Sequence, residues 1–264
     1  MNVKDHIQRV TIVGAGNVGH NFGLAFKQAG YLIHEIYSRT QDSAVALSQR
    51  LNCNFTTDLD QLDPGADLYI IAVNDDALSS IIENFPFQNK LTVHTSGATS
   101  LEVFEGKGFS DYGIFYPVQS FSKEDTESLA PIPICVEAKK EENKELLMSF
   151  ARSLSMKVYQ LDSEKRKALH VAAVFANNFS NHMYAIAEEL LDDSDINFDI
   201  IRPLIERTAK KINNRKPANI QTGPAVRHDQ KIIQKHLEHL KSYPEYKDLY
   251  ESITASILKK QANG

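Results

Sequence analysis

Short apolar runs alternate with helix-like segments along residues 9–160. The runs are rich in Ile, Val and Tyr, a composition typical of strands that are covered on both faces. They occupy residues 9–14, 32–38, 66–73, 91–96, 112–117, 131–137 and 156–161. Strands that alternate with crossover helices form a parallel sheet, so this pattern predicts an α/β fold with a mostly parallel sheet.

From residue 162 onward a helical pattern replaces the strand pattern. Residues 163–191 predict one long helix, because apolar side chains recur at helical spacing and define a buried face. These side chains are Leu169, Ala172, Ala173, Ala176, Phe179, Met183, Ile186 and Leu190. Residues 242–260 predict a final amphipathic helix. We therefore expect an all-helical second domain over residues 162–264, after an α/β domain over residues 1–161.

A glycine fingerprint lies between the first predicted strand and the helix that follows it. In the stretch GAGNVG, Gly14, Gly16 and Gly19 would allow a tight turn, a close approach of a pyrophosphate and close packing of helix on sheet. Free N–H groups at the start of that helix favour anionic phosphates. We expect the phosphate loop of a dinucleotide site, which also includes Asn17 and Val18.

The end of the second predicted strand indicates which dinucleotide is bound. An acidic residue there would accept hydrogen bonds from ribose hydroxyls, whereas Ser38, Arg39 and Thr40 offer donors and one positive charge. Such a set suits a 2′-phosphate, which an arginine pairs with bidentately. The sequence therefore favours NADP over NAD. The alternative is that Arg39 is simply a solvated arginine after a strand.

Two further strand ends carry polar groups to the same edge of the sheet, where ligands bind in open α/β folds. Val73 and Asn74 follow one strand and are expected beside the cofactor. Ser96 and Gly97 follow another and are expected to contact the substrate, with Ser96 also a candidate catalytic residue. His94 precedes them, and a buried structural histidine is the alternative for it.

The long helix carries the remaining catalytic candidates. On a regular helix, at about 100° per residue, His170, Asn177, Asn181 and Glu188 lie near one line opposite the apolar face. We expect His170 to be the proton donor and Asn177 to position the substrate, although a solvated polar face is the alternative. Lys167 is a reserve candidate for the proton donor.

Composition and charge narrow the class of protein. The 264 residues carry a net charge of −5, which gives no broad attraction to nucleic acid. Two cysteines without metal-like spacing predict neither a zinc site nor a disulfide framework, so we expect no metal and a reducing, cytoplasmic location. The sequence has no run of about eighteen apolar residues, the length that would predict a membrane-spanning helix.

The stretches GAGNVG, HTSG, YPVQSFS, HVAAVFANN and TGPAVRHD together resemble a bacterial oxidoreductase family. Its members join a Rossmann-like domain to a helical DUF2520 domain and are distantly related to pyrroline-5-carboxylate reductase and the β-hydroxyacid dehydrogenases. The resemblance covers nearly the whole chain. It implies an NADP cofactor and a helical second domain that makes a homodimer, but no particular substrate.

This chain also departs from its relatives. The hydroxyacid dehydrogenases place a catalytic Lys and an Asn one helical turn apart, whereas His170 and Asn177 are two turns apart. The related proteins commonly have RGD where this chain has residues 227–229, and HP where it has Tyr116 and Pro117. These changes weaken the case for His228 or Tyr116 as required residues. Arg227 still matches, and its planar guanidinium is suited to a substrate carboxylate.

Together these features favour an NADP-dependent oxidoreductase that transfers a hydride between NADPH and a small carbonyl or imine substrate, with 2-oxo acids among the candidates. Two alternatives stay open. One is a non-catalytic NADP-binding sensor or assembly protein, which the absence of the usual Lys and Asn pair favours. The other is hydride exchange between NADP and a deazaflavin.

Overall fold

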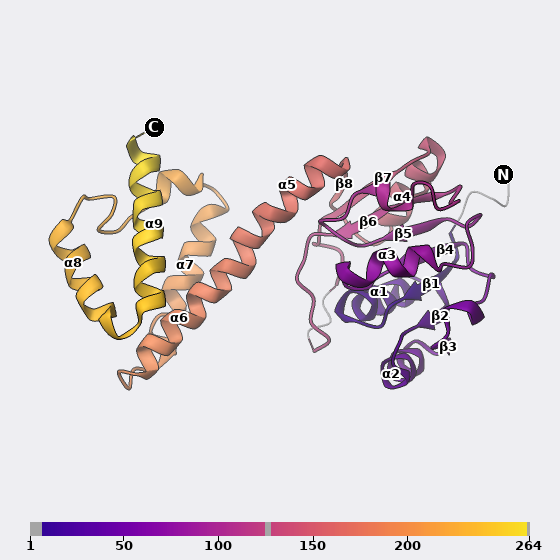
Figure 1. The fold of residues 1–264 in the computed structure, drawn as a ribbon, viewed down its shortest axis with the longest axis horizontal. Helices are drawn as coiled ribbons and strands as arrows, with labels where there is room; N and C mark the ends of the chain where they lie inside the picture. Colours follow the sequence, from indigo (N-terminus) through magenta and orange to yellow (C-terminus); the bar gives the residue numbers. More distant parts are fainter. Residues whose placement is uncertain (1–6, 125–127, 263–264) are drawn as a thin grey trace. The chain divides into compact units, whose positions relative to one another are not determined.

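The protein divides into two compact units, which we describe separately. In the computed structural model, residues 7–124 and 128–262 are described (Figure 1). The first unit is Met1–Ala176 and the second is Asn177–Gly264. The strands end at Gln160, near the domain boundary that the sequence indicates, but the first unit also includes the helix that follows.

The first unit is built on an eight-stranded sheet with the order β3-β2-β1-β4-β5-β6-β7-β8. All neighbouring strands are parallel except β6 and β7, which are antiparallel. The strands are β1 (Arg9–Val13), β2 (Leu32–Tyr37), β3 (Asn54–Thr56), β4 (Leu68–Ile71), β5 (Thr92–His94), β6 (Tyr112–Pro117), β7 (Ile134–Ala138) and β8 (Val158–Gln160). The mostly parallel sheet is confirmed, and each of the seven apolar runs forms a strand.

Helices cover both faces of this sheet (Figure 1). They are α1 (Asn17–Gln28), α2 (Gln41–Leu51), α3 (Asp75–Glu83), α4 (Glu141–Arg152) and α5 (Ser163–Ala173). Because side chains alternate along a strand, Ile70 packs with α1, α2 and α4, whereas Tyr69 and Ile71 pack with α3. Leu169 of α5 packs on Tyr116 and its neighbours, so α5 contributes to the covering of β6 and β7.

The second unit is helical, as expected. It contains α6 (Ser180–Asp192), α7 (Arg202–Ile212), α8 (Gln230–His239) and α9 (Pro244–Ala262). Met183, Ile186 and Leu190 of α6 line an apolar cavity together with residues of α9. Asp229 caps α8, because its carboxylate accepts the Ile232 N–H at 3.2 Å. Among the described residues, none of the helices combines the length and the apolar character that crossing a bilayer requires.

One prediction about the long helix was wrong. A π-helical turn, Val174–Phe179, separates α5 from α6. A π-helix has a wider turn than an α-helix, so the angle of 100° per residue does not hold across it. The expected line from His170 through Asn177 to Glu188 is therefore not continuous, and Phe179, expected on the buried face, is 48% exposed.

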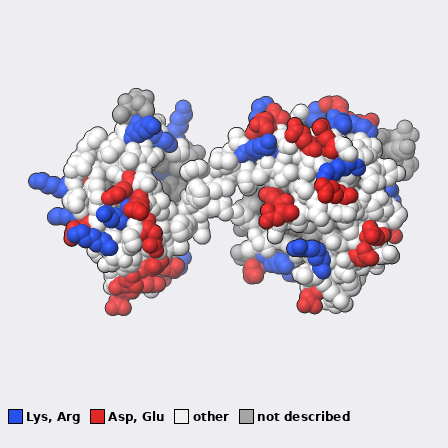
Figure 2. Space-filling model, in the orientation of Figure 1, with Lys and Arg blue, Asp and Glu red and all other residues white. Residues whose placement is uncertain are grey.

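Charged side chains of both signs are mixed over the visible face of the first unit (Figure 2). Several form exposed ion pairs, such as Lys107 with Glu83 at 2.6 Å. Pairs of this kind contribute at most about 1 kcal/mol to stability. The fold therefore depends mainly on the two apolar layers, and the buried ion pair of Arg166 described below stands apart from these surface pairs.

Candidate active site

The glycine loop has the geometry that its sequence predicts. Gly14 has a φ of +122°, and a Cβ atom there would lie 2.3 Å from the Ala72 carbonyl oxygen. A Cβ atom on Gly19 would lie 1.9 Å from the Gly14 carbonyl oxygen. Both positions therefore require glycine. Gly16 differs, because a Cβ there would meet open space, which leaves room for a phosphate group beside the backbone.

The start of α1 is suited to an anion. Gly16 is the N-cap, so no side chain competes for the first N–H groups of the helix, at Asn17, Val18 and Gly19. The first turn contains no acidic residue. Val73, which follows β4, lies close to the loop, because its Cγ1 is 3.0 Å from the Cβ position of Gly14. The loop and the end of β4 thus lie side by side at the start of α1, where free N–H groups favour an anion.

At the end of β2, Ser38 is buried, whereas Arg39 and Thr40 are exposed. Glu35, the nearest acid on the strand, accepts the Asp63 N–H at 2.8 Å and is buried. Burial raises the pKa of Glu35. Its carboxylate is engaged inside the protein, and the exposed charge that directly follows this strand is that of Arg39.

The loop after β5 is shaped by Ser96. Its Oγ accepts the N–H groups of Ala98 at 3.1 Å and Thr99 at 2.9 Å, which closes a tight turn. The hydroxyl hydrogen of Ser96 can still be donated to a ligand. His94 is fully buried, and burial together with the charge of Arg166 lowers its pKa to about 3. A neutral His94 accepts the Ser96 N–H at 3.2 Å, so it supports the loop and is not a proton donor.

His170 meets this loop and the end of β6. Its Nδ1 lies 3.2 Å from the Tyr116 hydroxyl. The two rings meet edge to face, with an interplanar angle of 72°. A Cβ atom on Gly97 would lie 2.5 Å from the same Nδ1 and 2.8 Å from Cζ of Tyr116. The absence of a side chain at residue 97 therefore lets the loop backbone, His170 and Tyr116 come together.

Tyr116 is a functional candidate here, although its departure from the family pattern HP argued against a required role. It is the fifth residue of β6 and lies near the carboxyl end of that strand. Strands β1, β4, β5 and β6 are parallel, so Tyr116, the Ser96 loop and the glycine loop share one edge of the sheet, which we call the carboxyl edge. The place of Tyr116 near the end of a predicted strand is therefore the feature of the sequence that could have identified it as a site residue.

Two predicted site residues belong to the second unit. Asn177 lies within the π-helical turn, and Arg227 is exposed in the loop before α8. Their contact with a substrate stays a prediction. Lys167, the reserve proton donor, forms an exposed ion pair with Glu164 at 2.9 Å.

Neither cysteine is an activated nucleophile. Burial raises the pKa of Cys53 and of Cys135 to about 11, so both are thiols at neutral pH. In the described ranges, no group of three or more His, Cys, Asp or Glu side chains is arranged to hold a metal ion. The candidate groups at the carboxyl edge are the glycine loop, Arg39 and the residues around His170.

A parallel sheet whose first loop cradles phosphates defines a Rossmann-type dinucleotide-binding protein. Residues 1–113 match the Rossmann-like domain, and residues 132–257 match the domain of unknown function DUF2520. A "putative NADP oxidoreductase" from Bacteroides fragilis has 40% identity and a TM-score of 0.90, with 97% of this chain and 99% of that chain covered. The chain belongs to this family of oxidoreductases, which join a Rossmann-like domain to a DUF2520 domain.

More distant structures share the fold. An imine reductase from Myxococcus stipitatus in complex with NADP⁺ has 15% identity and a TM-score of 0.68, with 97% of this chain and 95% of that chain covered. A pyrroline-5-carboxylate reductase from Coxiella burnetii has 15% identity and a TM-score of 0.57, with 98% of both chains covered. No curated protein matches the chain.

Proposed function

We propose that this protein uses NADPH to reduce a small imine or carbonyl compound, with His170 as the proton donor. The observation that carries the proposal is the contact between His170, Tyr116 and Gly97 at the carboxyl edge, which the glycine loop shares. The imine and pyrroline-5-carboxylate reductases that share the fold favour a C=N bond as the reacting group, and a C=O bond is the alternative.

The residues present fit NADP. Gly16 leaves open space at the start of α1, and Arg39 offers an exposed guanidinium beside the hydroxyls of Ser38 and Thr40. When bound, NADPH supplies a hydride. The chain's own residues hold the phosphates, through the N–H groups of the glycine loop, and hold the 2′-phosphate, through Arg39.

His170 and Tyr116 have separate roles in this proposal. When His170 is protonated, its Nδ1–H donates to the Tyr116 hydroxyl oxygen, and this hydrogen bond orients the ring with Nε2–H available to a substrate. Nε2–H of this imidazolium then donates its proton to the substrate as the C=N or C=O bond is reduced, which leaves a neutral imidazole that solvent protonates again. The Ser96 hydroxyl and the backbone at Gly97 would orient the substrate. Asn177 and Arg227 are proposed to bind it as well, Arg227 through a carboxylate.

The direct test is oxidation of NADPH, followed by absorbance, with a panel of cyclic imines, 2-oxo acids and aldehydes. Turnover with at least one class is expected. Tight NADPH binding without turnover would favour the sensor or assembly role. Turnover only with a deazaflavin would favour exchange between the two hydride carriers. Mass spectrometry of small molecules that co-purify with the protein would narrow the panel.

We also propose that the second unit makes a homodimer. The turn before α7 and α7 itself expose Ile200, Leu204 and Ile212, which are 70%, 65% and 50% accessible. Large apolar side chains that are exposed along one segment favour a protein–protein interface there. Light scattering at micromolar concentration should give the mass of a dimer, and Leu204→Lys should shift it toward that of a monomer. A wild-type monomer would contradict the proposal.

A cytoplasmic location is the remaining part of this proposal. Both cysteines are free, and Cys135 is buried, as expected for a protein that folds in a reducing compartment. Fractionation of cells that express the protein at its natural level would test this, and recovery outside the cytoplasmic fraction would contradict it.

A further inference from the structure

A buried arginine lies one helical turn before His170. Arg166 is 1% exposed and is the largest fully buried side chain among the described residues. Its guanidinium donates to the Glu137 carboxylate, to the Thr99 carbonyl and, at 3.3 Å, to the Ser163 hydroxyl. A charged side chain is rarely buried unless it is paired, so its presence here needs an explanation.

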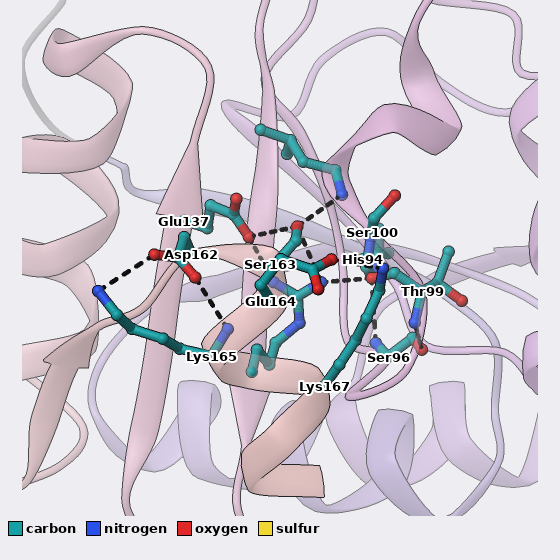
Figure 3. A network of polar contacts seen from close by, with 12 residues as sticks. His94, Ser96, Thr99, Ser100, Glu137, Asp162, Ser163, Glu164, Lys165 and Lys167 are labelled. Carbon is teal, nitrogen blue, oxygen red and sulfur yellow. Dashed lines mark hydrogen bonds and ion pairs between the residues drawn. The ribbon is translucent and has the colours of Figure 1, made fainter.

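The contacts of Arg166 join three separate segments. Glu137 belongs to β7, Thr99 to the loop that begins at Ser96, and Ser163 to the first turn of α5. Ser163 adds to the network, because its hydroxyl donates to Glu137 at 2.8 Å and accepts the Leu101 N–H at 3.0 Å (Figure 3). We call Arg166, Glu137, Ser163 and the backbone of Thr99 and Leu101 the arginine clamp.

The distance from the arginine clamp to the contact between His170 and Tyr116 is nearly the same along α5 as along β6. Four residues separate Arg166 from His170, which is about 6 Å along α5. Glu137 is paired with Ile114, and Tyr116 is two residues farther along β6, which is roughly 6.8 Å. The helix and the strand thus advance by nearly the same distance from the clamp to the contact between His170 and Tyr116.

Stability alone does not explain this arrangement. Replacing a buried ion pair with well-packed apolar residues is often neutral or stabilising. Arg166 is also incompletely satisfied, because its Nε has no hydrogen-bond partner among the described residues. An apolar side chain could fill the same volume, but it could not fix the direction and height of α5 against both the loop and β7. What the guanidinium adds is geometric, since it holds three segments at once.

We propose that Arg166 is a positioning residue: through Glu137 and Thr99 it holds α5 and the Ser96 loop in the register that brings His170 against Gly97 and Tyr116. The inference rests on the proposed role of His170. It extends that role by assigning the placement of the proton donor to a buried group that does not itself touch the substrate.

The test compares four full-length variants. Arg166→Met/Glu137→Met removes both charges together, so neither is left buried and unpaired. Arg166→Lys keeps a charge but cannot span Glu137 and Thr99 in the same way. Ser163→Ala leaves the ion pair intact and removes one tie to the loop. Lys165→Met, an exposed neighbour on the same turn, is the matched control.

The primary readout is the NMR signal of the His170 ring, assigned by its loss in His170→Gln, because this signal requires no substrate. We expect the double variant to fold, with a melting temperature near that of the wild type but with displaced His170 signals. On a substrate found in the panel, we expect kcat to fall by roughly tenfold to a hundredfold, with the Kd for NADPH unchanged. Arg166→Lys should show smaller changes in the His170 signals and in kcat than the double variant. Lys165→Met should match the wild type in both quantities.

Wild-type His170 signals and kcat in a folded double variant would overturn the inference. If the double variant does not fold, the inference is tested with Ser163→Ala and Arg166→Lys. Unchanged His170 signals in both of these variants would also overturn the inference. If no compound in the panel is reduced, the proposed function fails, whereas the NMR comparison still decides whether Arg166 positions His170.

Discussion

The Tyr116 hydroxyl lies 3.2 Å from Nδ1 of His170 and joins the end of β6 to α5. Burial raises the pKa of Tyr116, so the phenol stays protonated at neutral pH and can donate this hydrogen bond. The contact engages Nδ1 and leaves Nε2, the other ring nitrogen, for the proton donation that we propose. Several expected outcomes depend on this pairing.

His170→Gln should lower turnover by about 10² to 10⁴, the usual range for loss of a general acid. The Kd for NADPH should change little, because the groups that we propose to hold the phosphates lie in the glycine loop. Steady-state kinetics and a fluorescence titration measure the two quantities. The exposed His239, changed to Gln, serves as the control. Undiminished turnover in His170→Gln would remove the residue from the mechanism.

Tyr116→Phe should lower turnover by roughly threefold to tenfold, since one neutral hydrogen bond contributes about 1 kcal/mol. The substitution should have no further effect when His170 is already Gln, because a residue that acts through His170 is not additive with it. Tyr112→Phe on the same strand is the matched control. Equal effects of Tyr116→Phe in both backgrounds would show that the tyrosine acts independently.

Gly97→Ala should separate the loop from His170. The added Cβ would lie 2.5 Å from Nδ1, so the ring, the loop or both must move. A displacement of this size at a reacting group can lower turnover roughly a hundredfold. Kinetics, together with the His170 NMR signal, would detect the change, and the exposed Ala98, changed to Ser, is the control. Full activity in Gly97→Ala would mean that the loop does not have to approach the histidine.

Arg39 should set the cofactor preference. A charge-assisted hydrogen bond contributes about 1.5 to 3 kcal/mol, so the wild type should prefer NADPH over NADH by roughly tenfold to a hundredfold. Arg39→Asp removes the phosphate ligand and adds repulsion, which should bring the preference to parity or reverse it. Titration of both cofactors measures this. Lys157→Asp makes the same change of charge on an exposed residue elsewhere and should keep the preference. Equal wild-type affinities would refute the assignment.

Glu35 should make the stability of the protein depend on pH. Burial raises its pKa in the folded protein, so the folded state holds this proton more tightly than the unfolded chain does. The stabilising contribution is complete below the ordinary pKa of a glutamate and is lost as the pH rises through the raised value. Glu35→Gln stays neutral and can still accept the Asp63 N–H. The free energy of unfolding of this variant should therefore not show the decrease that the wild type shows as the pH rises.

Chemical unfolding of wild type and Glu35→Gln between about pH 3 and pH 8 measures the difference. The exposed Glu105, changed to Gln, is the control. If the wild type and Glu35→Gln respond to pH in parallel, burial does not perturb Glu35 and the explanation fails.

The sequence predicted the sheet well because buried parallel strands have a strong local signal. The strand β3, Asn54–Thr56, was missed because three residues at the edge of a sheet carry only one large apolar side chain. The π-helical turn was also missed. Nothing in a periodic pattern distinguishes a wide turn from a regular one, so the phase of the polar line after Val174 could not be predicted.

The site was predicted in part for a similar reason. Glycine spacing is local, and it located the phosphate loop directly. Tyr116 and Arg166 depend on contacts between distant segments. In the sequence SEKRK, Arg166 is indistinguishable from its exposed neighbours Lys165 and Lys167, and only the position of Glu137 on β7 accounts for its burial. Arg166 therefore carries no signal at short range, whereas Tyr116 had one in its place near the end of a predicted strand.

The reversal of direction at β7 has a consequence for how the chain reaches its own site. Because β7 and β8 run opposite to β6, β8 leads away from the carboxyl edge, and the helix that follows turns back toward it. Had β7 been parallel to β6, β8 would have ended at the carboxyl edge, and α5 would have travelled away from the cofactor with His170 on it. One change of strand polarity thus turns a helix that would only cover the sheet into one that brings His170 to the carboxyl edge.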